Sequence, residues 1–140
     1  MDGITFVVEG QPVPQPRPRT VNVRGRSMSF VPRGHPIHAY RQAVAIMARA
    51  AGLREHPGQV EVAMLFVVAR PPSHWTKTGL AKSAPRWLGK PDGDNLQKGV
   101  LDALIGVAYA DDSQVARWSG SKRYADRGEI AHTTVTVTSL

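Results

Sequence analysis

Apolar residues recur at helical spacing in two stretches of the chain. The first stretch begins at His35-Pro36, because proline suits the first position of a helix, and it ends near Gly52, a residue that favours helix termination. Its predicted buried stripe consists of Ile37, Tyr40, Val44, Met47 and Ala51.

The second helical stretch begins at Asp94 or Asn95, since either side chain can cap a helix, and it runs to about Gly106. In this helix the apolar residues form one face, and charged residues lie on the opposite face. The predicted buried stripe consists of Leu96, Val100, Ala103, Leu104 and Val107.

Runs rich in β-branched residues predict four strands, and a turn at residues 126–128 joins the last two. The order strand, helix, strand, loop, helix, strand, strand predicts an α+β fold. We expect residues 1–140 to form a single domain with a mixed or antiparallel sheet of about four strands and two helices. The four predicted strands are Ile4–Glu9, Gln59–Ala69, Gln114–Tyr124 and Ile130–Thr138.

Two polar, proline-bearing segments interrupt this pattern. Residues 10–35 are mostly loop, because prolines deny backbone donors, although a short irregular hairpin can form around Gly25. Residues 70–90 are long for a loop in a small domain, which suggests a functional segment. Trp75 and Trp87 within it either stack on unpaired bases or anchor the loop to the core.

The net charge is +7, and the two signs of charge are separated along the chain. Residues 10–54 hold eight arginines and no acid, and residues 62–91 hold five cations and no acid. This separation predicts a polyanionic partner, with nucleic acid the natural one. The candidate DNA-binding residues are Arg17, Arg19, Arg24, Arg26, Lys77, Lys82, Arg86 and Lys90.

The chain has no cysteine, which excludes disulfides and thiolate metal sites. Its longest apolar run, residues 62–69, is too short for a bilayer span of ~20 residues. The first residues carry an early acid and no basic segment typical of a signal peptide. We therefore expect a soluble cytoplasmic protein.

Five of the eleven acids lie between residues 92 and 112, in a chain that is otherwise basic. Asp92 and Asp94 are two positions apart, so in extended backbone their carboxylates can converge on one hard cation. A plain turn is the alternative, because Pro, Asp, Gly and Asn are all turn residues. A calcium-binding EF-hand is excluded, because the sixth position from Asp92 is Gln97 instead of Gly and the twelfth is Ala103 instead of Glu.

On the predicted helix, Asp94, Lys98 and Asp102 share one outward face. Lys98 either forms a helix salt bridge with Asp102 or contacts a phosphate beside the carboxylates. The pair Asp111-Asp112, at the start of the next strand, can add a third carboxylate. Such an oxygen-rich site beside a lysine is typical of metal-assisted phosphodiester hydrolysis.

The motifs DGDNLQK, DAL and DDSQV, between Lys90 and Val115, closely resemble those of the RusA-type Holliday junction resolvases. The resemblance implies Asp92, Asp94 and Asp112 as metal-binding carboxylates and Lys98 as the catalytic lysine, with the role of Asp111 open. It implies Mg²⁺ as the cofactor, with Mn²⁺ as a possible substitute. It also implies a homodimeric bacterial or phage-encoded endonuclease that nicks four-way junctions symmetrically in DNA recombination and repair.

Two alternatives remain beside this hypothesis. One is a non-catalytic protein of the same fold that binds branched DNA and uses the carboxylates for structure. The other is a nuclease for other branched DNA. Lys98 favours an enzyme, because a binding module needs no cation among the acids.

Overall fold

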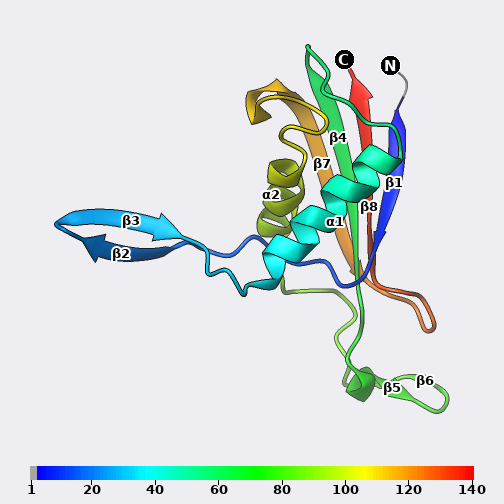
Figure 1. The fold of residues 1–140 in the computed structure, drawn as a ribbon. Helices are drawn as coiled ribbons and strands as arrows, with labels where there is room; N and C mark the ends of the chain where they lie inside the picture. Colours follow the sequence, from blue (N-terminus) through cyan, green and yellow to red (C-terminus); the bar gives the residue numbers. More distant parts are fainter. Residues whose placement is uncertain (1–2) are drawn as a thin grey trace.

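The computed structural model describes residues 3–140, and in it a four-stranded sheet carries two α-helices on one face (Figure 1). The strands lie in the order β1-β8-β4-β7; β8 is antiparallel to β1 and to β4, whereas β4 and β7 are parallel. This mixed sheet confirms the predicted α+β fold. The strands are β1 (Ile4–Glu9), β4 (Val60–Val68), β7 (Val115–Tyr124) and β8 (His132–Ser139).

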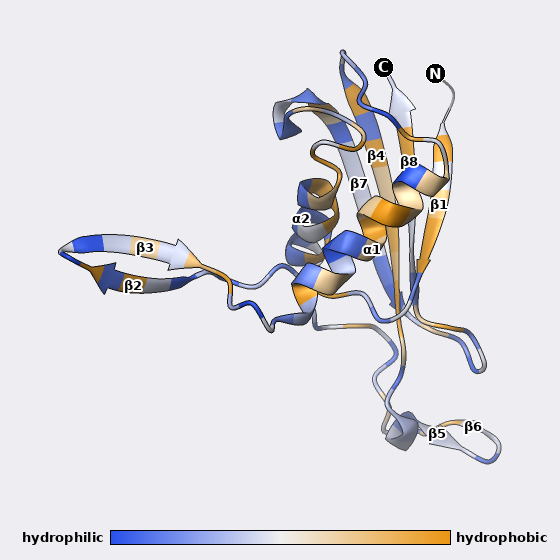
Figure 2. Cartoon of the chain, in the orientation of Figure 1, coloured by the Kyte–Doolittle hydropathy of each residue, from blue (hydrophilic) through white to orange (hydrophobic). Residues whose placement is uncertain are grey.

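The core lies between the sheet and the two helices, α1 (Pro36–Ala50) and α2 (Gly93–Ala103). Alternate residues of β1, β4 and β8 face the helices and are buried, which is the period of two that a strand imposes. Figure 2 shows the hydrophobic residues gathered along β1, β4 and α1. The principal buried side chains are Phe6, Val62, Phe66, Val135, Ile37, Val44, Leu96 and Val100.

Helix α1 begins as predicted, because Nδ1 of His35 accepts the backbone N–H of Ile37 at 3.0 Å. The predicted stripe is wrong at its C-terminal end, where Ala48 is buried while Met47 and Ala51 are exposed. The helix turns through 3.6 residues, so a stripe that starts at Ile37 returns to the core at position 48.

Helix α2 starts earlier than the capping prediction placed it. Asp92 is its N-cap, with extended backbone, and the carbonyl of Asp92 accepts the N–H of Leu96 at 3.2 Å. The helix ends at Ala103, before Gly106, whose positive φ of 82° belongs to the following turn. All five residues of the predicted stripe are buried, although Leu104 is the C-cap and Val107 lies beyond the end of the helix.

Two appendages leave this body (Figure 1). Residues 19–30 form a regular hairpin of β2 (Arg19–Val23) and β3 (Arg26–Phe30), called the arm below. Residues 70–89, called the lobe, contain a 3₁₀ turn at Pro72–His74 and the short strands β5 (Trp75–Thr76) and β6 (Gly79–Leu80).

The lobe is attached to the end of the sheet, and its two tryptophans lie in different surroundings. Arg70 lies 4.2 Å above the Tyr124 ring and donates to the carbonyl of Pro85 at 2.6 Å. Trp75 anchors the lobe, because the Arg127 guanidinium lies 5.4 Å from the centre of its ring. Trp87, in contrast, is 82% exposed.

No helix within residues 3–140 is long and apolar enough to cross a membrane.

The turn between β7 and β8 is held by a bidentate pair of Arg123 and Glu129, with N–O distances of 2.7 and 2.8 Å. The Arg123 hydrogen bonds, with the N–H of Asp126, lower the pKa of Glu129 from its ordinary 4.5 to about 2. A carboxyl group with a lowered pKa stabilises the fold above its ordinary pKa, and this contribution is lost as the pH falls toward 2.

We predict that Glu129→Gln lowers the urea midpoint of unfolding at pH 7, modestly because the pair is exposed. The difference from the wild type should shrink as the pH falls from 4.5 toward 2. Glu55→Gln is the control, because Glu55 is exposed and makes no ion pair among residues 3–140. Equal midpoints for wild type and Glu129→Gln at pH 7 would contradict the prediction.

Candidate active site

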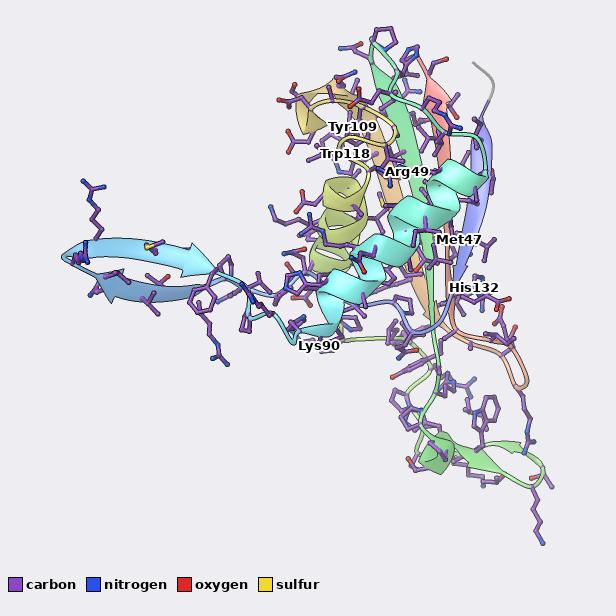
Figure 3. All side chains as sticks on the ribbon, in the orientation of Figure 1. Met47, Arg49, Lys90, Tyr109, Trp118 and His132 are labelled. Carbon is purple, nitrogen blue, oxygen red and sulfur yellow. The ribbon has the colours of Figure 1, made fainter. Side chains whose placement is uncertain are left out.

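An open cavity of about 280 Å³ lies between α2 and the start of β7. Figure 3 labels Trp118 and Tyr109 near the C-terminal end of α2, and Lys90 at the opposite end of that helix. The cavity combines three carboxylates, one lysine and one tryptophan. Its lining residues are Asp94, Gln97, Lys98, Leu101, Asp102, Asp112, Val115 and Trp118.

Helix α2 supplies one cation and two carboxylates to this cavity. Asp94, Lys98 and Asp102 are spaced by four residues, and burial of Leu96 and Val100 turns them away from the core. Within residues 3–140, Lys98 makes no ion pair and no hydrogen bond, so the alternative of a salt bridge to Asp102 is not formed. The Lys98 ammonium therefore remains available to a ligand in the cavity.

Helix α2 packs closely on β7 beside the cavity. A Cβ atom added at Gly120 would lie 2.7 Å from the Gln97 side chain, which shows that Gln97 lies directly over the β7 backbone. On another side of α2, the chain after β1 crosses the helix, where the N–H of Gln15 donates to the carbonyl of Asn95 at 2.9 Å. Helix α2 is thus clamped between two other segments.

The Asp111-Asp112 pair does not enter a strand directly, contrary to the sequence prediction. Asp111 caps a short 3₁₀ turn at Asp112–Gln114, and β7 begins only at Val115. The Asp111 carboxylate accepts the N–H of Ser113 at 2.8 Å, and the hydrogen bonds from Ser113 hold the pKa of Asp111 below its ordinary value. Asp111 therefore shapes the turn, while Asp112 faces the cavity.

Gln114 makes four hydrogen bonds, two with the start of this turn and two with the body. Its carbonyl oxygen accepts the N–H groups of Ala110 and Asp111, at 2.9 and 3.1 Å. Its amide nitrogen donates to the carbonyls of His56 and Gly58, at 2.7 and 2.8 Å. The glutamine of the DDSQV motif thus holds in place the turn that contains Asp112. This role was not predicted from the sequence.

Tyr109 lies under the cavity, fully buried, and donates its hydroxyl to the carbonyl of Leu101 at 2.6 Å. Burial raises the pKa of Tyr109, and the negative charges of Asp102 and Asp112 raise it further. The phenol therefore stays neutral and serves as a structural donor. Asp102 and Asp112 both line the cavity.

Asp92 lies at the edge of the site and is not among the residues that line the cavity. Its carboxylate is 3.3 Å from the Lys90 ammonium, and both side chains are exposed. The segment before it is held by Lys122 of β7, which donates to the carbonyls of Gly89 and Pro91 at 2.8 and 2.9 Å. Lys122, like Gln97 and Trp118, is a site residue that the sequence analysis did not single out.

The cavity has the oxygen donors that a hard divalent cation takes. Mg²⁺ is usually held by one or two carboxylates together with waters and substrate phosphates. Asp94, Asp102 and Asp112 line the cavity, but no three acidic or histidine side chains among residues 3–140 gather closely enough to hold a metal by themselves. The donor set therefore fits Mg²⁺ bound with help from a substrate better than it fits a closed structural metal site.

The eight candidate DNA-binding residues lie on the two appendages and beside the site, and all are exposed. Arg19 and Arg26 are on the arm strands, Arg24 is in the arm turn, and Arg17 lies two residues before the arm. Lys77, Lys82 and Arg86 are in the lobe, and Lys90 follows it.

Comparison with known proteins identifies a matching family model and a similar protein. The sequence model of the family described as "Endodeoxyribonuclease RusA" matches residues 9–138. The chain is also 33% identical over 133 residues to YqaN of Bacillus subtilis (strain 168), a protein described as uncharacterized. That alignment covers 93% of this chain and 94% of YqaN.

We predict that Gln114→Ala lowers the free energy of unfolding by about 1–3 kcal/mol, because it removes the partners of four backbone groups. Urea unfolding measures the change. Gln42→Ala is the control, since Gln42 is exposed on α1 and has no side-chain hydrogen bond within residues 3–140. The role given to Gln114 fails if the two variants unfold at the same urea concentration.

Proposed function

The chain belongs to the RusA endodeoxyribonuclease family, and from this membership we propose that it resolves four-way DNA junctions by Mg²⁺-dependent hydrolysis of phosphodiester bonds. The family supports nuclease action on branched DNA. The finer terms of the proposal, namely the metal, the residue roles and the paired symmetric cuts in recombination and repair, rest on the site.

The observation that carries the proposal is the unpaired Lys98 ammonium in the same cavity as Asp94, Asp102 and Asp112. A protein that only binds DNA gains nothing from carboxylates beside a phosphate, because they repel it. In metal-assisted hydrolysis of phosphodiesters, carboxylates hold the metal ion, and a separate cation can meet the charge of the transition state.

The residues take the following roles. Asp94 and Asp112, which line the cavity, would hold Mg²⁺, or Mn²⁺ as a substitute, with Asp92 at the edge of the site and Asp102 beside them. When bound, the metal supplies neutralisation of phosphate charge and a more acidic water. Lys98 contacts a non-bridging phosphate oxygen and stabilises the negative charge that develops there. Gln114 and Asp111 hold Asp112 in place.

The exposed cations of the arm and the lobe bring the polyanion to this site. The protein carries a net charge of +7, and the segments that bear these cations contain no acid. Each phosphate that a cation neutralises releases counterions from DNA, so we expect affinity to fall steeply as salt is added.

The alternative of a non-catalytic branched-DNA-binding protein predicts binding without cleavage. The alternative of a nuclease for other branched DNA predicts cleavage of flaps in preference to four-way junctions. A single assay separates the three: wild-type protein with a four-way junction, a flap and linear duplex, each with and without Mg²⁺.

We predict that Asp94→Asn and Lys98→Ala remove cleavage by different routes. Asp94→Asn keeps the shape of the side chain but loses a metal-holding charge, so it should bind the junction in EDTA at least as well as the wild type and not cut it in Mg²⁺. Lys98→Ala should cut about 10²–10³-fold more slowly, the usual cost of losing one well-placed stabilising donor.

Gel shift in EDTA and cleavage in Mg²⁺ measure the two properties separately. Asp126→Asn is the matched control, because Asp126 is an exposed carboxylate outside the cavity and should leave both properties unchanged. Wild-type cleavage by folded Asp94→Asn and Lys98→Ala would assign the acidic stretch a structural role.

We further propose that the protein acts as a homodimer, because two symmetry-related strands of a junction require two identical sites related by a twofold axis. Sedimentation equilibrium at micromolar concentration should give twice the mass of the chain without DNA, and the mass of two chains plus one junction when junction DNA is present. One chain alone without DNA, and one chain per junction with it, would overturn this part of the proposal.

A further inference from the structure

The arm has one polar face and one apolar face. Cross-strand pairing places Val21 opposite Met28, Arg19 opposite Phe30, and Val23 opposite Arg26, all on the same face. The other face carries the pairs Thr20–Ser29 and Asn22–Ser27, and each of these is joined by a side-chain hydrogen bond.

Nothing within residues 3–140 covers the apolar face. Val21, Val23, Met28 and Phe30 are between 39% and 55% exposed, and none of them belongs to the hydrophobic core. Figure 1 shows the arm extending away from the sheet and the helices. A two-stranded hairpin is marginally stable alone in water, so an exposed apolar face on such an element indicates a partner.

The charge of the arm determines which partner fits. Arg19 and Arg26 border the apolar face, and Arg24 forms the turn with Gly25. Arg24 has a φ of 51°, a left-handed conformation that Asn, Asp or Gly adopts more readily than arginine. Residues 10–54 contain no acid, so the arm of a second copy would bring arginine against arginine. A polyanion that also presents apolar surface matches both features.

We propose that the arm is a nucleic-acid-binding β-ribbon whose arginines contact phosphates while Val21, Met28 and Phe30 pack against exposed base faces at the branch point of the DNA. This inference rests on the proposed function and extends it from the cleavage site to the recognition of branched DNA. Apolar side chains insert where base stacking is interrupted, and base–side-chain stacking tolerates any sequence. A continuous duplex offers fewer such faces than a branch point.

The segment that leads to the arm packs against α2, the helix that carries Asp94 and Lys98. The chain crosses α2 at Asn95 and at Gly99, where a Cβ atom would lie 3.6 Å from the carbonyl oxygen of Val13. The arm begins only a few residues later, at Arg19. Its five-residue strands extend about 17 Å from Arg19, at 3.3–3.4 Å per residue. One DNA branch can therefore contact the arm while a nearby phosphate occupies the cavity.

The test measures binding in EDTA, by fluorescence anisotropy, with a four-way junction and with linear duplex. The triple variant Val21→Thr, Met28→Thr and Phe30→Thr removes the apolar face but keeps residues that favour strands. We expect its affinity for the junction to fall about tenfold or more, its affinity for duplex to fall less, and its dependence on salt to stay that of the wild type.

Three further variants serve as comparisons for the triple variant. Arg19→Gln with Arg26→Gln should flatten the salt dependence, by roughly 0.9 in the logarithmic slope for each phosphate that the protein no longer neutralises. Ile130→Thr removes an exposed apolar side chain far from the arm and should bind as the wild type does. Replacing residues 19–30 with two glycines deletes the arm without touching the core, because Arg19 pairs with Phe30 and the ends lie close together.

The inference is overturned if the triple variant and the arm deletion both bind the junction as tightly as the wild type. It is also overturned if the triple variant loses self-association in sedimentation while its monomer keeps DNA affinity, because a second copy would then cover the face. Wild-type protein that binds junctions but does not cut them in Mg²⁺ contradicts the proposed function alone, and the expected binding losses would still support the arm. Wild-type protein that binds no DNA overturns both.

Discussion

Repulsion between the carboxylates that face one cavity is the constraint on which the arrangement of the site depends. Like charges that share a cavity repel one another, and the repulsion grows as they approach. Asp94, Asp102 and Asp112 line the same cavity, and within residues 3–140 no ion pair neutralises any of them. The fold must therefore hold them in place with interactions made elsewhere. It does so by burying Leu96 and Val100 beneath α2 and by tying the turn before β7 to the body through Gln114.

The sequence predicted the parts of this arrangement that depend on local periodicity. Helical spacing identified the buried stripe of α2 and hence the outward face of Asp94, Lys98 and Asp102, and the strand patterns identified the sheet. The prediction failed at the end of α1, because it placed Met47 and Ala51 in the stripe, whereas a turn of 3.6 residues returns the stripe from Ile37 to the core at Ala48.

The remaining parts of the site depend on contacts between distant segments, which periodicity does not encode. Gln114 bonds to carbonyls more than fifty residues earlier, and Lys122 holds the backbone about thirty residues before it. In the sequence each looks like an ordinary polar residue of a strand or its start. The register between β7 and β4 sets Trp118 opposite Val62, which lies on the face of the sheet that the helices cover. Trp118 faces the cavity because of this register.

Positive and negative charges are separated in space for the same physical reason that they are separated along the chain. A carboxylate on the arm or in the lobe would pair with the arginines and lysines there and would weaken their attraction for a phosphate backbone. A further lysine in the cavity would pair with the carboxylates and compete with a metal for them. Lys98 does not compete in this way: it lines the cavity with Asp94 and Asp102 but forms an ion pair with neither. The free ammonium group of Lys98 and the uncovered apolar face of the arm thus have one property in common. Each can make a favourable interaction for which the protein alone offers no partner, and a branched polyanion can be the partner of both.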